Sequence, residues 1–267
     1  MKGFRTIWPV CLLLAAVLIG CAPTGKTVPG KPKVTPKSRA EAKEKLGLSM
    51  IEEGNLQMGL KELLEARDLD PGNPDIHLGI GIAYRKLGEY AKAVTYFQRA
   101  LALKPDFPDA HNNLGMVYAL MGRWEKAIDL FEKAISNYKY ERRHTAFENL
   151  GTVYFYRGDY RQAVVNYQKA LRLEPDYSPA YEKMGLAYER LKEWDHALFA
   201  YQQAVRLEPR NPLPHLYLGR LCFQLKRYED AETALRSAIR NDVTGIVAQE
   251  ARRLLREIKK AREGKGS

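Results

Sequence analysis

Histidine and cysteine are the residue types best suited to acid–base, nucleophilic or metal chemistry, and the sequence contains five histidines and three cysteines. The cysteines are Cys11, Cys21 and Cys222, a spacing that fits neither a disulfide framework nor a zinc site. Three of the histidines, at positions 77, 111 and 215, stand four residues before a recurring glycine, which indicates a scaffold role. The sequence contains no zinc-protease histidine pair, phosphate-binding glycine loop or nucleophile elbow. We therefore expect no catalytic residue, no metal, no cofactor and no small-molecule substrate.

Cys21 is the cysteine to which a specific reaction can be assigned. It follows a basic start, with Lys2 and Arg5, and an apolar run over residues 11–19, which together are typical of an export signal. The segment LIGC at 18–21 resembles the lipobox of bacterial lipoproteins, in which cleavage precedes the cysteine and its thiol receives a diacylglycerol. This resemblance implies a signal peptide over 1–20 and lipidation, palmitate included, at Cys21. An ordinary signal peptide that contains a cysteine is the alternative.

The next stretch, residues 21–39, is predicted to be a lipid-anchored tether. It holds four prolines, two glycines and no large apolar residue other than valine, so it has nothing with which to build a core. Its lysines either remain solvated or touch anionic headgroups. Ala22 follows the lipidated position and, by the sorting rule of enteric lipoproteins, favours the periplasmic face of the outer membrane over the inner membrane.

The formal net charge of +11 is concentrated at the two ends of the chain. Residues 46–249 carry 27 basic and 27 acidic side chains, so this long middle part is neutral. A protein that binds nucleic acid through an extended face needs a continuous excess of lysine and arginine. The charge distribution therefore argues against a nucleic-acid partner.

The elements that position these residues follow from an internal repeat. Glycines at 47, 81, 115, 151, 185 and 219 are spaced 34, 34, 36, 34 and 34 residues apart. Alanine returns nineteen residues after each of them, and a large apolar residue returns after sixteen. This pattern resembles the tetratricopeptide repeat (TPR), a helix–turn–helix unit. The resemblance covers residues 40–245 as six units, which are 40–73, 74–107, 108–143, 144–177, 178–211 and 212–245.

The spacing explains why such units fold and stack. Apolar residues recur at three and four positions within each half-unit, which is the period of an amphipathic helix. Small residues at the recurring glycine and alanine positions let the two helices of a unit approach closely. A glycine turn joins them, and Lys192 and Lys226 replace that glycine in the last two units at some cost. We expect an all-α protein, a right-handed superhelical solenoid of six repeats.

Two segments depart from the repeat. The third interval is two residues longer, and residues 137–144 replace its closing proline, which predicts either a longer loop or an extended second helix. Residues 246–263 carry an apolar stripe among basic residues. We interpret this stretch as a C-terminal helix that caps the last repeat, with a membrane-surface helix as the alternative.

The first helices of the repeats are expected to line a concave groove that binds a protein partner. Asn113 and Asn149 stand at one register in adjacent repeats, where they either hold a peptide backbone or reflect the repeat consensus. Tyr156 offers an apolar contact. The candidate cations for an acidic partner segment are Lys183, Arg190 and Arg220.

The plan of signal, lipobox, short tether and six repeats resembles the pilotin-type lipoproteins of type IV pilus biogenesis, PilF and PilW. The segment FENLG at 147–151, after the lengthened third unit, is similar to the middle region of that family. The resemblance implies a non-enzymatic outer-membrane scaffold whose partner is a secretin subunit or another pilus-assembly component. The alternative is a general periplasmic adaptor for cell-envelope enzymes such as peptidoglycan hydrolases.

Overall fold

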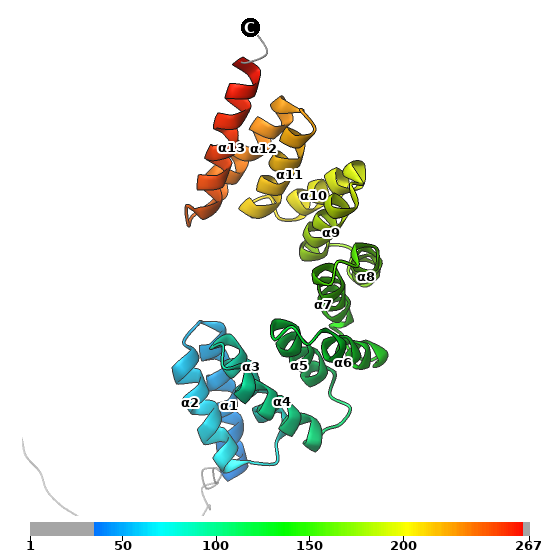
Figure 1. The fold of residues 1–267 in the computed structure, drawn as a ribbon. Helices are drawn as coiled ribbons and strands as arrows, with labels where there is room; N and C mark the ends of the chain where they lie inside the picture. The colour runs from blue at the N-terminus through cyan, green and yellow to red at the C-terminus, as the bar shows by residue number, and fades with distance from the viewer. Residues whose placement is uncertain (1–34, 264–267) are drawn as a thin grey trace, which may run out of the picture. The chain divides into compact units, whose positions relative to one another are not determined.

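The computed structural model describes residues 35–263, and the described residues from Pro36 onward form one compact unit. This part of the chain contains thirteen α-helices (Figure 1). The first six are α1 (Pro36–Glu52), α2 (Leu56–Leu69), α3 (Pro74–Lys86), α4 (Tyr90–Leu103), α5 (Pro108–Leu120) and α6 (Trp124–Ser136). The others are α7 (Arg143–Tyr156), α8 (Tyr160–Leu173), α9 (Ser178–Leu191), α10 (Trp194–Leu207), α11 (Pro212–Gln224), α12 (Tyr228–Asn241) and α13 (Ile246–Glu263).

Consecutive helices pair into six hairpins, and each hairpin packs on the next, which confirms the predicted tetratricopeptide fold. The odd-numbered helices from α1 to α9 also contact one another in series, so they form the inner wall of the array. No helix within 35–263 has the length and apolar character needed to cross a membrane. The lipobox and Cys21 lie outside the described residues.

The two helices of each repeat approach closely at the recurring glycines, as the sequence predicts. A Cβ atom placed on Gly151 would lie 2.7 Å from Cε1 of Tyr167 and 3.1 Å from the carbonyl oxygen of Ala163, both in α8. The aromatic ring of the second helix therefore occupies the space that a side chain on the first helix would need. The same relationship recurs in the other repeats, where Phe97, Phe131, Tyr201 and the leucines Leu63 and Leu235 face the glycines.

The helix start and the turns follow local chemistry. Helix α1 begins at Pro36, four residues before the predicted repeat boundary, because proline is preorganised for the first position of a helix. The predicted tether 21–39 is therefore too long at its end. Lys192 and Lys226 adopt a φ of 61°, the left-handed conformation that glycine supplies in the equivalent turns at Gly88 and Gly158.

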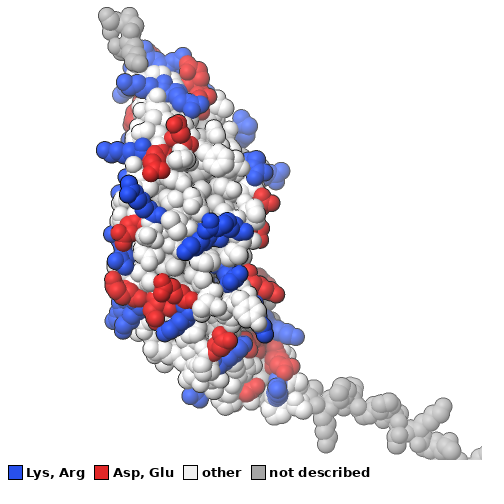
Figure 2. All heavy atoms as spheres, turned by 90° about the vertical axis from the view of Figure 1, so that its right-hand side faces the viewer, with Lys and Arg blue, Asp and Glu red and all other residues white. Residues whose placement is uncertain are grey.

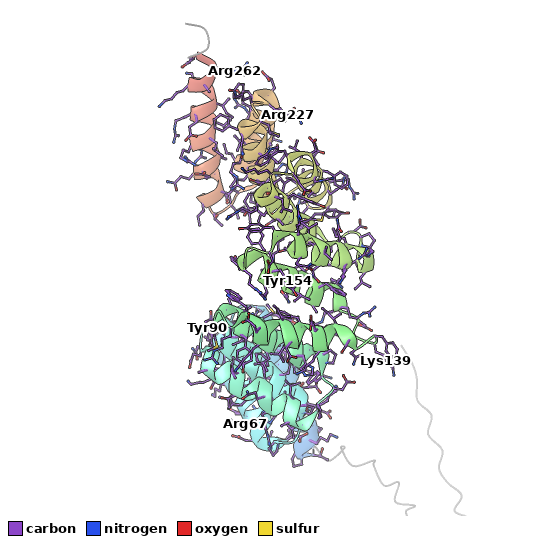
Figure 3. All side chains as sticks on the ribbon, turned by 45° about the vertical axis from the view of Figure 1, so that its right-hand side comes forward. Arg67, Tyr90, Lys139, Tyr154, Arg227 and Arg262 are labelled. Carbon is purple, nitrogen blue, oxygen red and sulfur yellow. The ribbon has the colours of Figure 1, made fainter. Side chains whose placement is uncertain are left out.

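The lengthened third interval is a longer loop. Residues 137–142 separate α6 from α7, whereas four residues separate the other repeats. Tyr140 in this loop is buried against Ala134 and Ala146, as Phe107 is buried against Ala100 and Ala110 one repeat earlier. Burial also raises the pKa of Tyr140 to about 12. Lys139 points away from the body at this loop (Figure 3).

Helix α13 packs against the last repeat, as a capping helix is expected to do. It buries Ala251, Leu254 and Ile258 against the preceding repeat. Arg262 forms ion pairs with Glu229 (3.2 Å) and Glu232 (3.1 Å) of α12 (Figure 3). On the exposed side of α13, the guanidinium of Arg253 pairs with Glu250 and Glu257.

The surface shows the mixed charge expected of a neutral body. Figure 2 shows basic and acidic side chains interspersed on the face it presents.

Two of the histidines predicted to have a scaffold role contact the loops between repeats. Nε2 of His77 lies 2.9 Å from the carbonyl oxygen of Pro71, and Nε2 of His215 lies 3.0 Å from that of Pro209. No cluster of three or more potential metal-ligating side chains is found within 35–263.

Candidate functional site

A pocket of about 500 Å³ opens on the inner wall at the middle of the array. It is lined by residues of four successive odd-numbered helices, α3, α5, α7 and α9, and by residues of α6. Its lining consists of Arg85, Met116, Ala119, Leu120, Trp124, Phe131, Asn149, Thr152, Val153, Tyr156 and Lys183. Three of the six residues predicted to contact a partner, namely Asn149, Tyr156 and Lys183, meet in this pocket.

The repeat register explains why these side chains converge. Leu120 and Tyr156 both stand five residues after a recurring glycine, and Met116 and Thr152 both stand one residue after it. Residues at one register occupy equivalent places on neighbouring hairpins, so they form columns along the inner wall. A contact surface that spans several repeats therefore follows from a pattern within a single repeat.

The apolar part of the pocket is unusually open to solvent. Leu120 is 56% exposed and Tyr156 is 70% exposed. The rings of Trp124 and Tyr156 are stacked, with centroids 6.4 Å apart and planes 9° apart. Exposed aromatic and aliphatic side chains held in a fixed arrangement are typical of binding surfaces.

The two asparagines are already engaged within the protein. Asn113 is 9% exposed, and its Nδ2 donates to the carbonyl oxygen of Asp109 at 2.9 Å in the same helix. The Nδ2 of Asn149 donates to Oδ1 of Asn112 at 3.1 Å, across the contact between α5 and α7. Asn149 lines the pocket, whereas Asn113 lies outside its lining. Contact of either residue with a partner stays a prediction.

Two of the three predicted cations are paired. The Lys183 ammonium bonds to Glu148, and Nη2 of Arg220 lies 3.0 Å from Oε1 of Glu189. These pairs neutralise the charges that were expected to attract an acidic segment. Their contact with a partner stays a prediction.

Arg190 is different, because it has no acidic partner among residues 35–263. Its guanidinium lies over the rings of Phe155 and Tyr160, 5.7 Å from each centroid, and Nη1 donates to the Tyr160 hydroxyl at 3.3 Å. The positive charge thus remains available at the inner wall, next to an aromatic surface.

Arg85 lines the pocket and was not singled out from the sequence. It stands four residues after its glycine, at a register where the other repeats carry Ile51, Ala119, Phe155, Glu189 and Phe223. Burial lowers the pKa of Arg85. A lone basic residue in a mainly apolar column is the sequence signal that points to this position.

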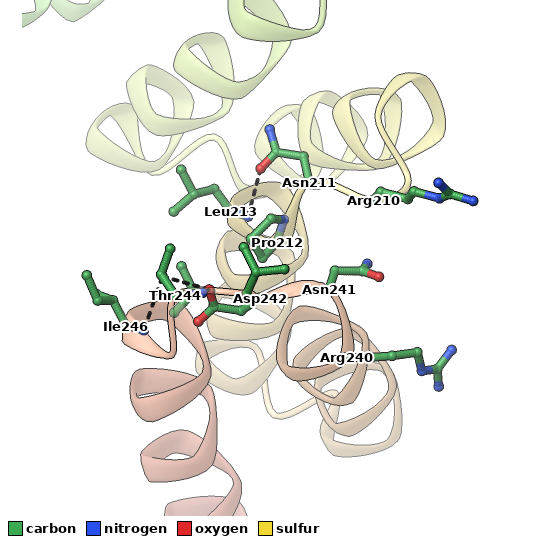
Figure 4. A pocket seen from close by; sticks show the side chains of 11 residues that line it. Arg210, Asn211, Pro212, Leu213, Arg240, Asn241, Asp242, Thr244 and Ile246 are labelled. Atoms are coloured by element: carbon green, nitrogen blue, oxygen red, sulfur yellow. Dashed lines mark hydrogen bonds between the residues drawn. The ribbon is translucent and has the colours of Figure 1, made fainter. Parts of the chain in front are cut away.

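A second hollow, of about 770 Å³, lies beside the loop between α12 and α13 (Figure 4). The polar side chains that line it accept hydrogen bonds from backbone amides. Oδ1 of Asn211 accepts from the amide of Leu213 at 3.1 Å, and the Asp242 carboxylate accepts from the amides of Thr244 (2.9 Å) and Ala248 (2.7 Å). We interpret this hollow as structural, because these side chains cap helices.

Comparison with known proteins agrees with this architecture. Residues 107–266 match the family model described as the cilia and flagella-associated protein 70 C-terminal domain, and residues 83–122 match the TPR repeat model. The type IV pilus assembly protein PilF of Pseudomonas aeruginosa is 32% identical over 93 residues, or 34% of this chain. This alignment spans 36% of the length of PilF, about a third.

Two solved structures have the same fold. The structure of Pseudomonas aeruginosa PilF superposes with a TM-score of 0.69 at 23% identity and covers 80% of this chain and 97% of that one. PilW, described as a widely conserved type IV pilus biogenesis factor, gives a TM-score of 0.72 at 19% identity and covers 79% and 96%. At these identities the likeness is one of fold.

Proposed function

The chain belongs to the family of the cilia and flagella-associated protein 70 C-terminal domain, whose repeats are tetratricopeptide repeats, and we propose that it is a non-enzymatic scaffold for type IV pilus biogenesis. The observation that carries this proposal is the mid-array pocket, where Asn149, Tyr156 and Lys183 come together from successive repeats. Its open apolar wall suits a segment of a partner protein.

The pilus assignment is supported by the relationship to PilF. A secretin subunit, or another component of pilus assembly, is the partner we propose. The scaffold would hold that partner while it reaches its membrane or assembles into its ring. Nothing in this role requires bond making or breaking.

The location we propose is the periplasmic face of the outer membrane. A signal peptide over 1–20 would be removed, and Cys21 would carry the lipid. The residues between Cys21 and α1 would connect the anchor to the repeat array. Several acyl chains, at about 0.8 kcal/mol per buried methylene, suffice for stable anchoring.

Deletion of the gene tests the scaffold role. We expect loss of secretin multimers on non-denaturing gels and loss of twitching, and we expect both to return with the wild-type gene. A gene carrying Tyr156→Ala should fail to restore them. Tyr138→Ala is the matched control, because Tyr138 is 76% exposed and lies in the loop between α6 and α7, outside the pocket lining. Normal multimers in the deletion strain would refute the pilus assignment.

The lipid anchor has its own test. Mass spectrometry of the mature protein should find an N-terminal Cys21 with acyl chains, and Cys21→Ser should accumulate as an uncleaved or mislocalised precursor. An unmodified N-terminus at another residue would refute lipidation at Cys21.

A further inference from the structure

The mid-array pocket contains two cations in different states. Lys183 is bonded to Glu148, whereas Arg85 has no acidic group within ion-pair distance in the described part of the chain. The Nε of Arg85 is buried and has no hydrogen-bond partner there. A buried N–H group without a hydrogen-bond partner is unfavourable, because burial removes its hydration.

We propose that Arg85 is the anion-binding group of this pocket and that the pocket recognises an internal segment of a partner protein in which an acidic side chain stands beside a bulky apolar one. This inference rests on the proposed role as a protein-binding scaffold and adds the chemistry of the bound segment. A carboxylate would give the Arg85 charge the acidic partner that it lacks among the described residues, and a guanidinium binds a carboxylate with two parallel hydrogen bonds.

The apolar half of the recognition follows from the apolar side chains that line the same pocket. Leu120 and Tyr156 are exposed, Met116 adds a flexible side chain, and Trp124 stacks on the ring of Tyr156. A volume of about 500 Å³ lies within the range of about 300–1,000 Å³ typical of sites that enclose small ligands. The pocket thus accommodates one large side chain with adjoining backbone.

The form of the segment follows from the continuity of the inner wall. Helix α1 contacts α3, so the row of odd-numbered helices extends past the pocket on that side, and on the other side the pocket wall continues through α7 onto α9. An extended chain can enter and leave along this row. A bound chain terminus is the alternative outcome, and the test separates the two.

The test is a selection from random eight-residue segments displayed between two folded flanks, with the full-length chain purified in detergent as the bait. We expect enriched segments to combine Asp or Glu with Phe, Tyr, Trp, Leu or Met. The most enriched segment is then synthesised with both ends blocked, and its Kd is measured by fluorescence polarisation. Arg85→Gln should weaken binding about ten- to 150-fold and abolish the preference for the acidic residue.

The controls separate the pocket from general surface charge. Arg99→Gln is matched to Arg85→Gln: Arg99 is exposed on α4, outside the pocket lining, and should leave the Kd unchanged. Arg85→Lys keeps the charge and should keep the acidic preference with weaker binding. Thermal melts by circular dichroism establish that each variant is folded.

Several results would overturn the inference. These are no enrichment, enrichment of basic or purely apolar segments, binding that requires a free carboxyl terminus, or an affinity indifferent to Arg85→Gln in folded protein. The outcome is independent of the pilus assignment, because the peptide assay involves no pilus component. An acidic-apolar consensus together with normal secretin multimers in the deletion strain would leave this inference standing and refute the pilus role.

Discussion

The ammonium group of Lys183 in α9 is bonded to the carboxylate of Glu148 in α7, one repeat earlier along the chain. Glu148 is 5% exposed, and the hydroxyl of Thr152 lies 3.3 Å from the same ammonium nitrogen. A side chain chosen from the sequence for contact with a partner thus also satisfies a buried charge of its neighbour. A change at Lys183 is therefore expected to alter stability whether or not it alters partner binding.

Lys183→Met should therefore destabilise the array, because it leaves the Glu148 carboxylate buried without its partner. Breaking a fully buried pair costs about 3–5 kcal/mol. Since the Lys183 side chain is 35% exposed, we expect a smaller loss, roughly 1–3 kcal/mol, measured by guanidinium unfolding. Lys45→Met is the matched control: Lys45 occupies the same register, is exposed, and should give little change. Equal stability of both variants would contradict the structural role of the pair.

Ala163→Leu should destabilise the fourth repeat by overpacking. Ala163 is fully buried where α8 packs closely on α7, and its carbonyl oxygen lies beside Gly151. Three added carbons there should cost about 1–3 kcal/mol. Ala91→Leu, on the exposed side of α4, serves as the control. Melting curves of the two proteins should differ, and an unchanged curve for Ala163→Leu would mean that this contact is looser than the structure indicates.

Lys192→Gly should stabilise the turn between α9 and α10. Lys192 has a φ of 61°, where a side chain costs about 1–2 kcal/mol relative to the right-handed conformation. Glycine removes that cost but loses more entropy on folding, so we expect a net gain of up to about 1 kcal/mol. The reverse change, Gly158→Lys, places a side chain at a φ of 86° and should destabilise by a similar amount. A decrease in the denaturation midpoint of Lys192→Gly would refute this expectation.

The start of α13 should be sensitive to acid. The hydrogen bond from the amide of Ala248, with those from Thr244, lowers the pKa of Asp242 from 3.8 to about 2. Because the folded-state pKa lies below the ordinary value, the carboxylate stabilises this cap at any pH above about 4. That contribution is lost as the pH falls through about 2. The amide resonances of Thr244 and Ala248 should follow this titration, and Asp242→Asn should remove it. A midpoint near 4 in the wild type would mean that the cap does not form in solution.

The architecture could be predicted from the sequence because each repeat places the same residue types at the same spacing. Gly151, Ala163 and Tyr167 recur as residue types at fixed spacing, and the structure brings all three into contact as that spacing predicts. Whether a longer loop or a longer helix follows α6 could not be predicted from the sequence. It depends on the tertiary contact of Tyr140 with Ala134 and Ala146, which the spacing of residues along the chain does not specify.

The site was predictable only in part, for a related reason. The register located Asn149, Tyr156 and Lys183 on the inner wall, because register sets the direction of a side chain. It does not set the partner of that side chain. Glu148 and Asn112 lie on other repeats, at positions outside the expected groove registers, and they engage Lys183 and Asn149. Arg85 could not be identified from the register, because no other repeat has a basic residue at the same position.

Helix α13 also bears on whether copies of this protein can polymerise end to end. Its residue Arg253 stands 34 positions after Gly219, at the place where every earlier first helix has a glycine to receive its second helix. The guanidinium and its two glutamate partners fill that place with charge. A hairpin from another molecule could dock there only by burying three ionised groups, which is far more costly than leaving them in water. The charged groups on this side of α13 therefore disfavour the docking of a further hairpin onto it.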